Sequence, residues 1–169
     1  MAISKLKVFA AAASVMAMAV TSAVQAAPVV QEIVISKDLQ KTLDKDYGAK
    51  EADFLKKDLR EAVERSLDKS GATKVAYVKL TIDEAKPNRP TFYQTSKNTS
   101  LSYGDSRSLG GARVEAQLYD SSGALLSTVK HKYFTFNLDD VIAQSTWSDE
   151  QRAFDSAAYK IRREAEKAG

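Results

Sequence analysis

The chain has 169 residues, with 25 Lys and Arg, 22 Asp and Glu, one His and no Cys. The absence of cysteine excludes a disulfide framework, a thiol nucleophile and a thiolate metal site, and a single histidine excludes a His-rich metal centre. Without Lys5 and Lys7 the net charge of +3 falls to +1, since 23 basic residues then face 22 acidic ones. No basic patch typical of a nucleic-acid binder remains, so no nucleic-acid partner is expected.

Residues 1–26 have the pattern of an export signal. Two lysines precede a short apolar run at 8–20, and the small-residue sequence Val-Gln-Ala at 24–26 is a cleavage site. The run is shorter than the roughly 20 residues that span a bilayer. We therefore expect cleavage after Ala26, a periplasmic or secreted protein, and no transmembrane segment after signal removal. Because no cysteine is available for acylation, no lipid anchor is expected either.

Residues 27–169 are predicted to form a single α+β domain. A strand at 29–36 is rich in β-branched residues, and a polar connection follows it. An amphipathic helix is predicted at 50–71, with Gly71 as a left-handed closing residue. Its apolar residues recur at three- and four-residue steps and form one stripe. The stripe consists of Leu55, Leu59, Ala62, Val63 and Leu67.

Alternating apolar and polar residues predict the next strands. The inward positions are Ala76, Val78, Leu80 and Ile82 in the strand at 75–83, and Ala112, Val114, Ala116 and Leu118 in the strand at 112–119. A sheet with one polar face favours antiparallel or mixed pairing. A hairpin turn at 120–123, with Gly123 at a positive φ, leads into a return strand at 124–136. The alternation there does not say which face carries His131, but the lysines on either side favour a solvated face.

The last predicted element is a helix at 146–168, in which Ser148 and Gln151 have the spacing of a capping box. Its apolar stripe consists of Trp147, Phe154, Ala158, Ile161 and Ala165. The complete order is β-α-β-loop-β-β-α. It predicts an α+β fold: a mixed or antiparallel sheet of about four strands with two helices on one face.

Residues 84–111 form a long connection between two predicted strands. A structureless loop of this length is uncommon inside a compact domain, so it is either a functional loop or a loop that includes short edge-strand segments. Aromatic and basic residues interleave with small polar ones, a composition suited to binding. The candidate binding residues are Arg89, Phe92, Tyr93, Tyr103 and Arg107. The alternative is structural: Phe92 and Tyr93 pin the loop to the sheet edge.

Four runs resemble a group of small exported proteins of Gram-negative bacteria. They are DEAKPNRPT at 83–91, LGGARV at 109–114, DSSG at 120–123 and TWSDEQRAFD at 146–155. The layout is also similar to lipoprotein-type domains of cell-envelope assemblies, although the lipid-bearing cysteine is absent. The resemblance implies an envelope location and an α+β fold. It implies no catalytic residue.

No motif in the chain indicates a particular chemistry. The sequence has no Gly-x-Ser-x-Gly elbow, no Gly-rich phosphate loop and no calcium loop, so no cofactor and no metal site are predicted. Three hypotheses remain: a non-enzymatic binding or interaction module that uses the 86–108 loop, a hydrolase that acts on an envelope polymer through carboxylates, and a structural or stress-related protein. For the first, the partner is another envelope protein or polymer. Two carboxylates that converge in a cleft would favour the enzyme, and an exposed apolar patch at the loop would favour binding.

Overall fold

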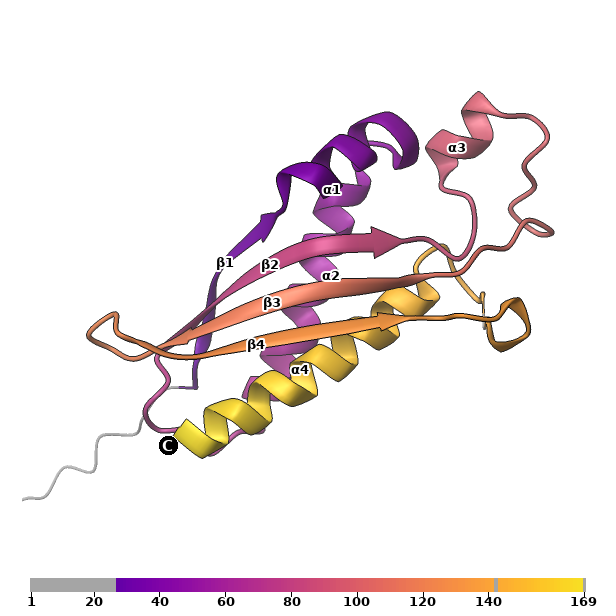
Figure 1. Ribbon diagram of the computed structural model, residues 1–169. Helices are drawn as coiled ribbons and strands as arrows, with labels where there is room; N and C mark the ends of the chain where they lie inside the picture. The colour runs from indigo at the N-terminus through magenta and orange to yellow at the C-terminus, as the bar shows by residue number, and fades with distance from the viewer. Residues whose placement is uncertain (1–26, 142, 169) are drawn as a thin grey trace, which may run out of the picture.

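The computed structural model describes residues 27–141 and 143–168, so the predicted signal at 1–26 lies outside the described residues. A sheet of four strands in the order β1-β2-β3-β4 runs through the molecule (Figure 1). β1 and β2 are parallel, whereas β2–β3 and β3–β4 are antiparallel, so the prediction of a mixed sheet is confirmed. The strands are β1 Val29–Ile35, β2 Tyr77–Lys86, β3 Gly111–Tyr119 and β4 Leu125–Phe134.

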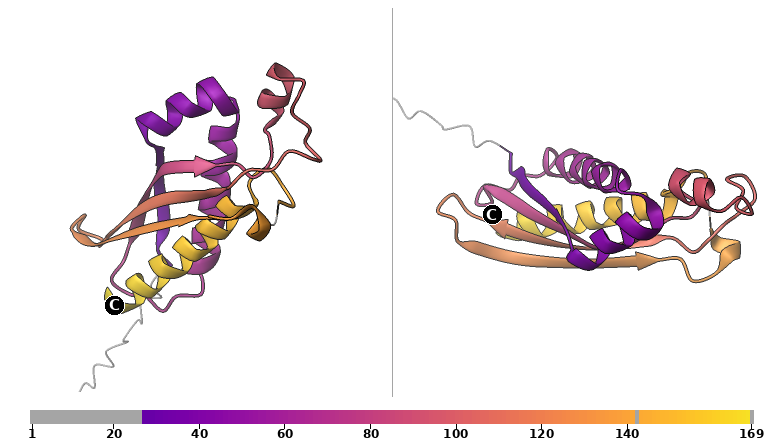
Figure 2. Two further views of the ribbon diagram at one scale, coloured as in Figure 1. Left: turned by 45° about the vertical axis from the view of Figure 1, so that its right-hand side comes forward. Right: turned by 90° about the horizontal axis from the view of Figure 1, so that it is seen from above.

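Two long helices, α2 (Glu51–Leu67) and α4 (Ser148–Ala168), lie side by side across one face of the sheet (Figure 2). This arrangement confirms the predicted α+β class. The described residues add four shorter helical segments: α1 (Lys37–Thr42), a π-helical turn η1 (Leu43–Tyr47), α3 (Phe92–Lys97) and a 3₁₀ turn η2 (Leu138–Asp140). No helix in the described ranges is both long and apolar enough to cross a membrane.

The core lies between the sheet and the two long helices. All members of both predicted helical stripes are buried, and Leu59, Phe154 and Ile161 have no exposed surface. The predicted inward residues of β3 are buried as well. In β2 the register shifts between Ile82 and Glu84, so Ile82 and Ala85 both reach the core and the strand continues to Lys86. A bulge of this kind adds a residue without breaking the pairing.

The ends of the helices differ from those predicted. α2 ends at Leu67 and a turn follows it, in which the Ser70 amide donates to the Leu67 carbonyl at 2.8 Å. Gly71 therefore does not close the helix, and its φ is not positive. A glycine with positive φ instead follows η1: Gly48, with φ 104°. Gly123 has the predicted positive φ, at 86°.

The predicted capping box of Ser148 and Gln151 is wrong. The Ser148 hydroxyl oxygen accepts a bond from the Ser145 amide at 2.8 Å, and the Gln151 amide donates to the Trp147 carbonyl at 2.9 Å. A capping box does occur in the long connection, where Thr91 and Gln94 form both of its reciprocal bonds and begin α3. The connection therefore contains a short helix, and the predicted alternative of edge-strand segments there is wrong.

His131 lies on the helix-facing side of β4, so the prediction of a solvated face is wrong. It alternates in phase with Val129 and Tyr133, which pack against the core, while Lys130 and Lys132 turn to the opposite face. Both ring nitrogens are buried without a hydrogen-bond partner among the described residues. Burial, and then the charge of Lys160 on α4, lower the pKa of His131 below its usual value.

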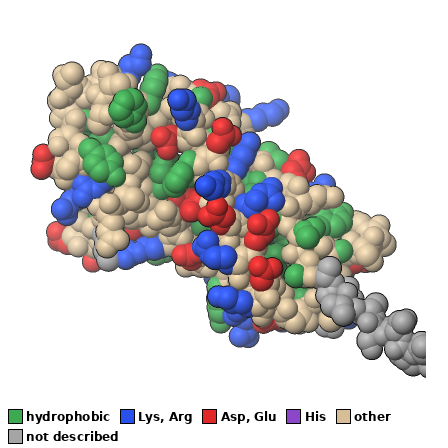
Figure 3. All heavy atoms as spheres, turned by 180° about the vertical axis from the view of Figure 1, so that it is seen from behind, with side chains coloured by type: hydrophobic (Ala, Val, Ile, Leu, Met, Phe, Trp, Pro, Cys, Tyr) green, Lys and Arg blue, Asp and Glu red, His purple; other side chains and the backbone are tan. Residues whose placement is uncertain are grey.

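The opposite face of the sheet faces the viewer in Figure 1. Ion pairs between neighbouring strands run across it: Glu32–Lys79 at 3.7 Å, Glu84–Arg113 at 2.9 Å and Glu115–Lys130 at 3.0 Å. In the described part of the chain no helix lies across this face. Seen from behind, the helix side shows acidic and basic side chains interspersed (Figure 3).

Candidate functional site

The β2–β3 connection, defined here as residues 87–110, closes on itself at its base. The Ser108 amide donates to the Asn88 carbonyl at 2.8 Å, and the Asn88 side-chain amide donates to the Ser108 carbonyl at 3.3 Å. The Ser108 hydroxyl donates to the Pro87 carbonyl at 2.5 Å. These bonds pair the two ends of the connection, so it leaves the sheet and returns at a fixed point.

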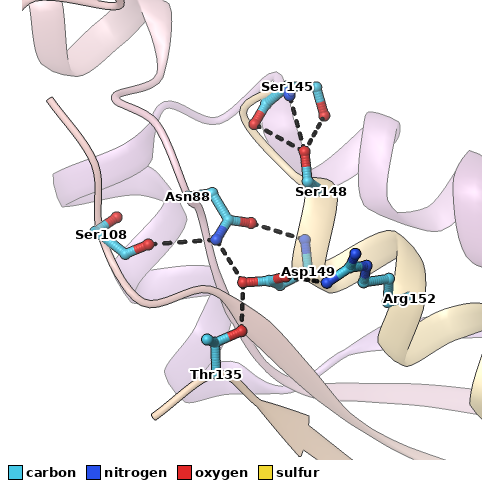
Figure 4. Close-up of polar contacts among 7 residues, drawn as sticks. All are labelled: Asn88, Ser108, Thr135, Ser145, Ser148, Asp149 and Arg152. Carbon is cyan, nitrogen blue, oxygen red and sulfur yellow. Dashed lines mark hydrogen bonds and ion pairs between the residues drawn. The ribbon is translucent and has the colours of Figure 1, made fainter. Parts of the chain in front are cut away.

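A buried polar cluster joins this base to α4 and to the end of β4 (Figure 4). The Asp149 carboxylate accepts bonds from Asn88 Nδ2 at 2.6 Å and from Thr135 Oγ1 at 2.5 Å. In return, the Asp149 amide donates to Asn88 Oδ1 at 2.7 Å. Asn88 thus caps one of the free N–H groups at the start of α4. In most helices this hydrogen bond comes from an N-cap residue directly before the helix. We call Asn88, Ser108, Thr135 and Asp149 the polar stem.

Two further contacts complete the polar stem. A Cβ atom at Gly110 would lie 2.5 Å from the Asn88 side-chain oxygen, so only glycine permits the observed approach. The Arg152 guanidinium lies 3.4 Å from Asp149 Oδ1 and offsets part of the buried charge. Sequence reasoning missed Asn88 and Thr135, because their partner Asp149 is 61 and 14 residues away. The only signal was the Gly-Gly pair at 110–111 beside a strand, which indicates a close backbone approach.

Arg89, a predicted binding residue, cross-links the connection internally and to the segment before α4. Its Nε donates to the Ala143 carbonyl at 2.5 Å, and its Nη1 donates to the carbonyls of Tyr103 and Gly104 at 2.6 and 2.7 Å. The guanidinium also lies 5.5 Å from the centre of the Tyr103 ring. Most of its donors are therefore used within the molecule.

Helix α3 presents its two aromatic residues differently. The Thr91 hydroxyl donates to the Tyr47 carbonyl at 2.6 Å and fixes the start of α3 against η1. Tyr93 packs there as well: a Cβ at Gly48 would lie 2.9 Å from the Tyr93 Cβ. Phe92 points away and is 88% exposed. Tyr93 therefore attaches α3 to η1 and not to the sheet edge. Phe92 is exposed and does not attach the loop to the sheet edge.

A pocket of about 300 Å³ opens between the end of β2 and the β2–β3 connection, which includes α3. Its apolar lining comes from Pro87, Pro90, Leu101 and Leu109, together with the ring of Tyr47. Two cations, Lys86 and Arg107, line it as well.

The two cations of this pocket differ in how far they are engaged. Lys86 pairs with Glu84 at 3.2 Å. Arg107 is exposed and forms no ion pair with another described residue. An anionic group that enters the pocket would therefore meet the Arg107 guanidinium as its unengaged partner.

A second pocket, of about 640 Å³, is lined in part by Thr135, a member of the polar stem. Phe134 and Phe136 line it with Lys132 and Arg152, and Phe136 is 89% exposed. The first pocket is lined by residues that follow β2 and the second by residues at the end of β4. These two strand ends lie at the same end of the molecule, where α4 begins (Figure 1). Large apolar side chains thus emerge at this end from two different segments.

Catalytic geometry is not evident among the described residues. Of five pockets that the described residues form, none is lined by two carboxylates. Glu150 is fully buried, and no other described residue forms a hydrogen bond with its carboxyl group. Burial, followed by the charges of Asp58 and Asp155, raises its pKa well above the usual 4.5. Within the described ranges, no group of three or more His, Cys, Asp or Glu side chains could hold a metal ion.

Comparison with known proteins adds little to this picture. No protein-family model matches the chain, and no curated protein matches it. One solved structure, described as a putative lipoprotein from Caulobacter crescentus, is 18% identical and covers 67% of this chain and 81% of its own, with a TM-score of 0.37. A similarity of that strength assigns neither a family nor a function. The resemblance to small exported proteins therefore stays a prediction.

Proposed function

We propose that the protein is an exported cell-envelope protein that acts as a non-enzymatic binding module through its 86–108 loop. The partner is another envelope protein or an envelope polymer. The location follows from the export pattern at 1–26. The contact surface is proposed from the exposed members of the candidate set, Phe92, Tyr103 and Arg107.

One observation carries this proposal: Phe92 is almost fully exposed on a segment that is held in place on several sides. The capping box of Thr91 and Gln94, the bond from Thr91 to Tyr47, and the polar stem all restrict the segment. An ordered surface loses little conformational entropy on binding, so its contacts contribute more to affinity. Exposed large apolar side chains often mark interaction sites.

The pocket beside Arg107 supplies a complementary polar contact. Its lining combines proline and leucine surface with a guanidinium that has no ion-pair partner among the described residues. Such a pocket suits a carboxylate or another anionic group attached to a small apolar one. An acidic side chain of a partner protein and an anionic substituent of a polymer both have this chemistry.

Site-specific photo-crosslinking in intact cells tests the proposal. A photoreactive phenylalanine analogue at position 92, or at position 103, should capture one defined partner. The matched control is position 29 at the start of β1, where the native Val29 is 59% exposed and pairs with Tyr77 at the other end of β2 from the loop. Equal capture at position 29, or none at 92 and 103, would contradict a contact surface on this loop.

Two pairs of variants separate binding from folding. Phe92→Ala and Arg107→Ala should weaken partner capture about tenfold or more, while their melting temperatures stay close to that of the unmodified chain. Arg89→Ala and Tyr93→Ala should lower the melting temperature instead, because these side chains contact the protein itself. If the Phe92→Ala and Arg107→Ala variants both capture the partner as well as the unmodified chain does, the loop has a structural role and is not the contact surface.

A further inference from the structure

Among the described residues, strand β4 has a free edge. In the order β1-β2-β3-β4 it pairs there with β3 on one side only, over residues 125–134. Alternate residues of an edge strand turn their N–H and C=O groups away from the sheet, where another strand can pair with them. This edge lies along α4 and away from the β2–β3 connection over most of its length (Figure 1).

Basic residues border this edge on both faces of the sheet. Lys130 and Lys132 stand on the open face, where Glu115 engages Lys130 at 3.0 Å. On the helix side, a groove of about 370 Å³ between β4 and α4 is lined by three cations, Lys160, Arg163 and Lys167, and by one carboxylate, that of Glu164. Lys167 pairs with Glu164 at 3.2 Å.

The floor of this groove is partly apolar, with Val129 from β4 and Tyr159 from α4. Lys160 and Arg163 are exposed and form no ion pair with another described residue. The groove therefore offers an apolar surface between cations that are free to engage an incoming anion. An extended chain laid along β4 would place one row of its side chains in the groove and the other row beside Lys130 and Lys132.

We infer that β4 accepts an acidic extended segment of a partner protein as an added antiparallel or parallel strand. Main-chain hydrogen bonds along the free edge supply the pairing, and the bordering cations select the charge of the segment. The preferred segment alternates acidic residues, which face Lys130 and Lys132, with acidic or small apolar residues over Val129 and Tyr159.

A second copy of this chain fits the edge poorly. Antiparallel pairing of β4 with itself would bring Lys130 and Lys132 of each copy close to the same lysines of the other. Like charges opposite one another on paired strands are destabilising. Lysine on an edge strand is a common means of preventing such self-association. The same charges that repel a second copy attract an acidic strand, so the surface is selective in both directions.

The test measures binding of dye-labelled peptides of about ten residues to the full-length chain by fluorescence anisotropy. One peptide alternates Glu with Val, one alternates Lys with Val, and one keeps the glutamates but has proline at alternate Val positions. We expect the Glu–Val peptide to bind and the Lys–Val peptide not to bind. The affinity of the proline peptide should be about tenfold or more below that of the Glu–Val peptide, because proline removes the main-chain donors.

Charge-reversal variants locate the surface. Lys130→Glu combined with Lys132→Glu should weaken the Glu–Val peptide about tenfold or more. The matched control, Lys57→Glu combined with Lys74→Glu, makes the same change in net charge at exposed lysines away from β4 and should change affinity less than about twofold. Backbone amides at 125–134 should become more protected from hydrogen exchange when the peptide binds.

Three results would overturn the inference. Equal binding of the proline peptide would mean that charge alone attracts the segment. An equal loss of affinity in both charge-reversal pairs would mean that net charge alone governs binding. Binding of vesicles that contain phosphatidylglycerol through Lys130 and Lys132, without binding of the Glu–Val peptide, would assign the basic border to an anionic lipid surface instead of a protein strand.

Discussion

The helix layer of α2 and α4 and the β2–β3 connection are both firmly attached to the sheet, but by different forces. The helices bury continuous apolar stripes that include Leu59 and Ile161. The connection is held by a few directed hydrogen bonds, which converge on Asn88 and Arg89. Apolar burial is spread over many atoms, whereas a hydrogen-bonded attachment depends on single donors and acceptors. The connection can therefore leave most of its surface exposed and still keep its shape.

The largest expected effect is in the helix layer. Leu59→Ala and Ile161→Ala should each lower the free energy of unfolding by about 2–5 kcal/mol, because each leaves a cavity in a fully packed site. Lys57→Ala, on the exposed side of α2, should change it by no more than about 0.5 kcal/mol. Chemical denaturation of the three variants measures this. Equal stabilities would break the distinction between the buried and exposed sides of α2.

The next effect is at the polar stem. Asn88→Ala should cost about 1–3 kcal/mol, since it leaves the Asp149 carboxylate and amide without their buried partner. Asn98→Ala, in the exposed part of the same connection, is the matched control and should cost no more than about 0.5 kcal/mol. Hydrogen exchange should also quicken in the first turn of α4. If α4 is unaffected, Asn88 does not cap that helix.

Glu150 provides a pH-dependent test of the helix layer. Its pKa is raised in the folded protein, so the folded state retains a proton that the unfolded chain releases above about pH 4.5. Stability from this group is present below that pH and is lost as pH rises toward the raised pKa, by up to about 1.4 kcal/mol per pH unit. Glu150→Gln removes the ionisation and should be the more stable protein at neutral pH.

Urea unfolding at several pH values measures the difference between Glu150→Gln and the unmodified chain. The difference should grow with pH. The control Glu61→Gln, whose side chain is half exposed on α2, should show no such growth. A pH-independent difference at Glu150 would mean that its carboxyl group reaches solvent or a partner when it ionises.

The smallest effect concerns the middle of the connection. Arg89→Ala should lower the free energy of unfolding by about 1 kcal/mol, because its bonds are made partly in contact with solvent. Its clearer signature is local: the amides near Tyr103 and Gly104 should exchange faster, while those of α2 and α4 stay unchanged. Arg107→Ala should leave the exchange pattern as it is. Faster exchange throughout the molecule would mean that the connection and the helix layer open together.

The sequence alone determined the parts of this protein that follow a local period. The 3.6-residue stripes of α2 and α4 and the two-residue alternation of β2 and β3 identify the core and the α+β class, and the turn at Gly123 identifies a hairpin. Each of these signals lies within a few neighbouring residues. The start of α4 was less predictable, because the Asp149 amide is capped by Asn88, which the local pattern does not contain.

Only the tertiary structure decided the candidate site. Asn88 and Asp149 are 61 residues apart, and nothing in either segment specifies the other. Arg89 was predicted to bind a partner, but in the folded protein it donates to distant backbone carbonyls and acts as a cross-link. The face that carries His131 likewise depends on how β4 packs on α4. Side-chain periodicity records which way a residue points along its own element. The partners that it meets depend on how the elements pack, so exposed Phe92 and Arg107 could be separated from buried Asn88 only after folding.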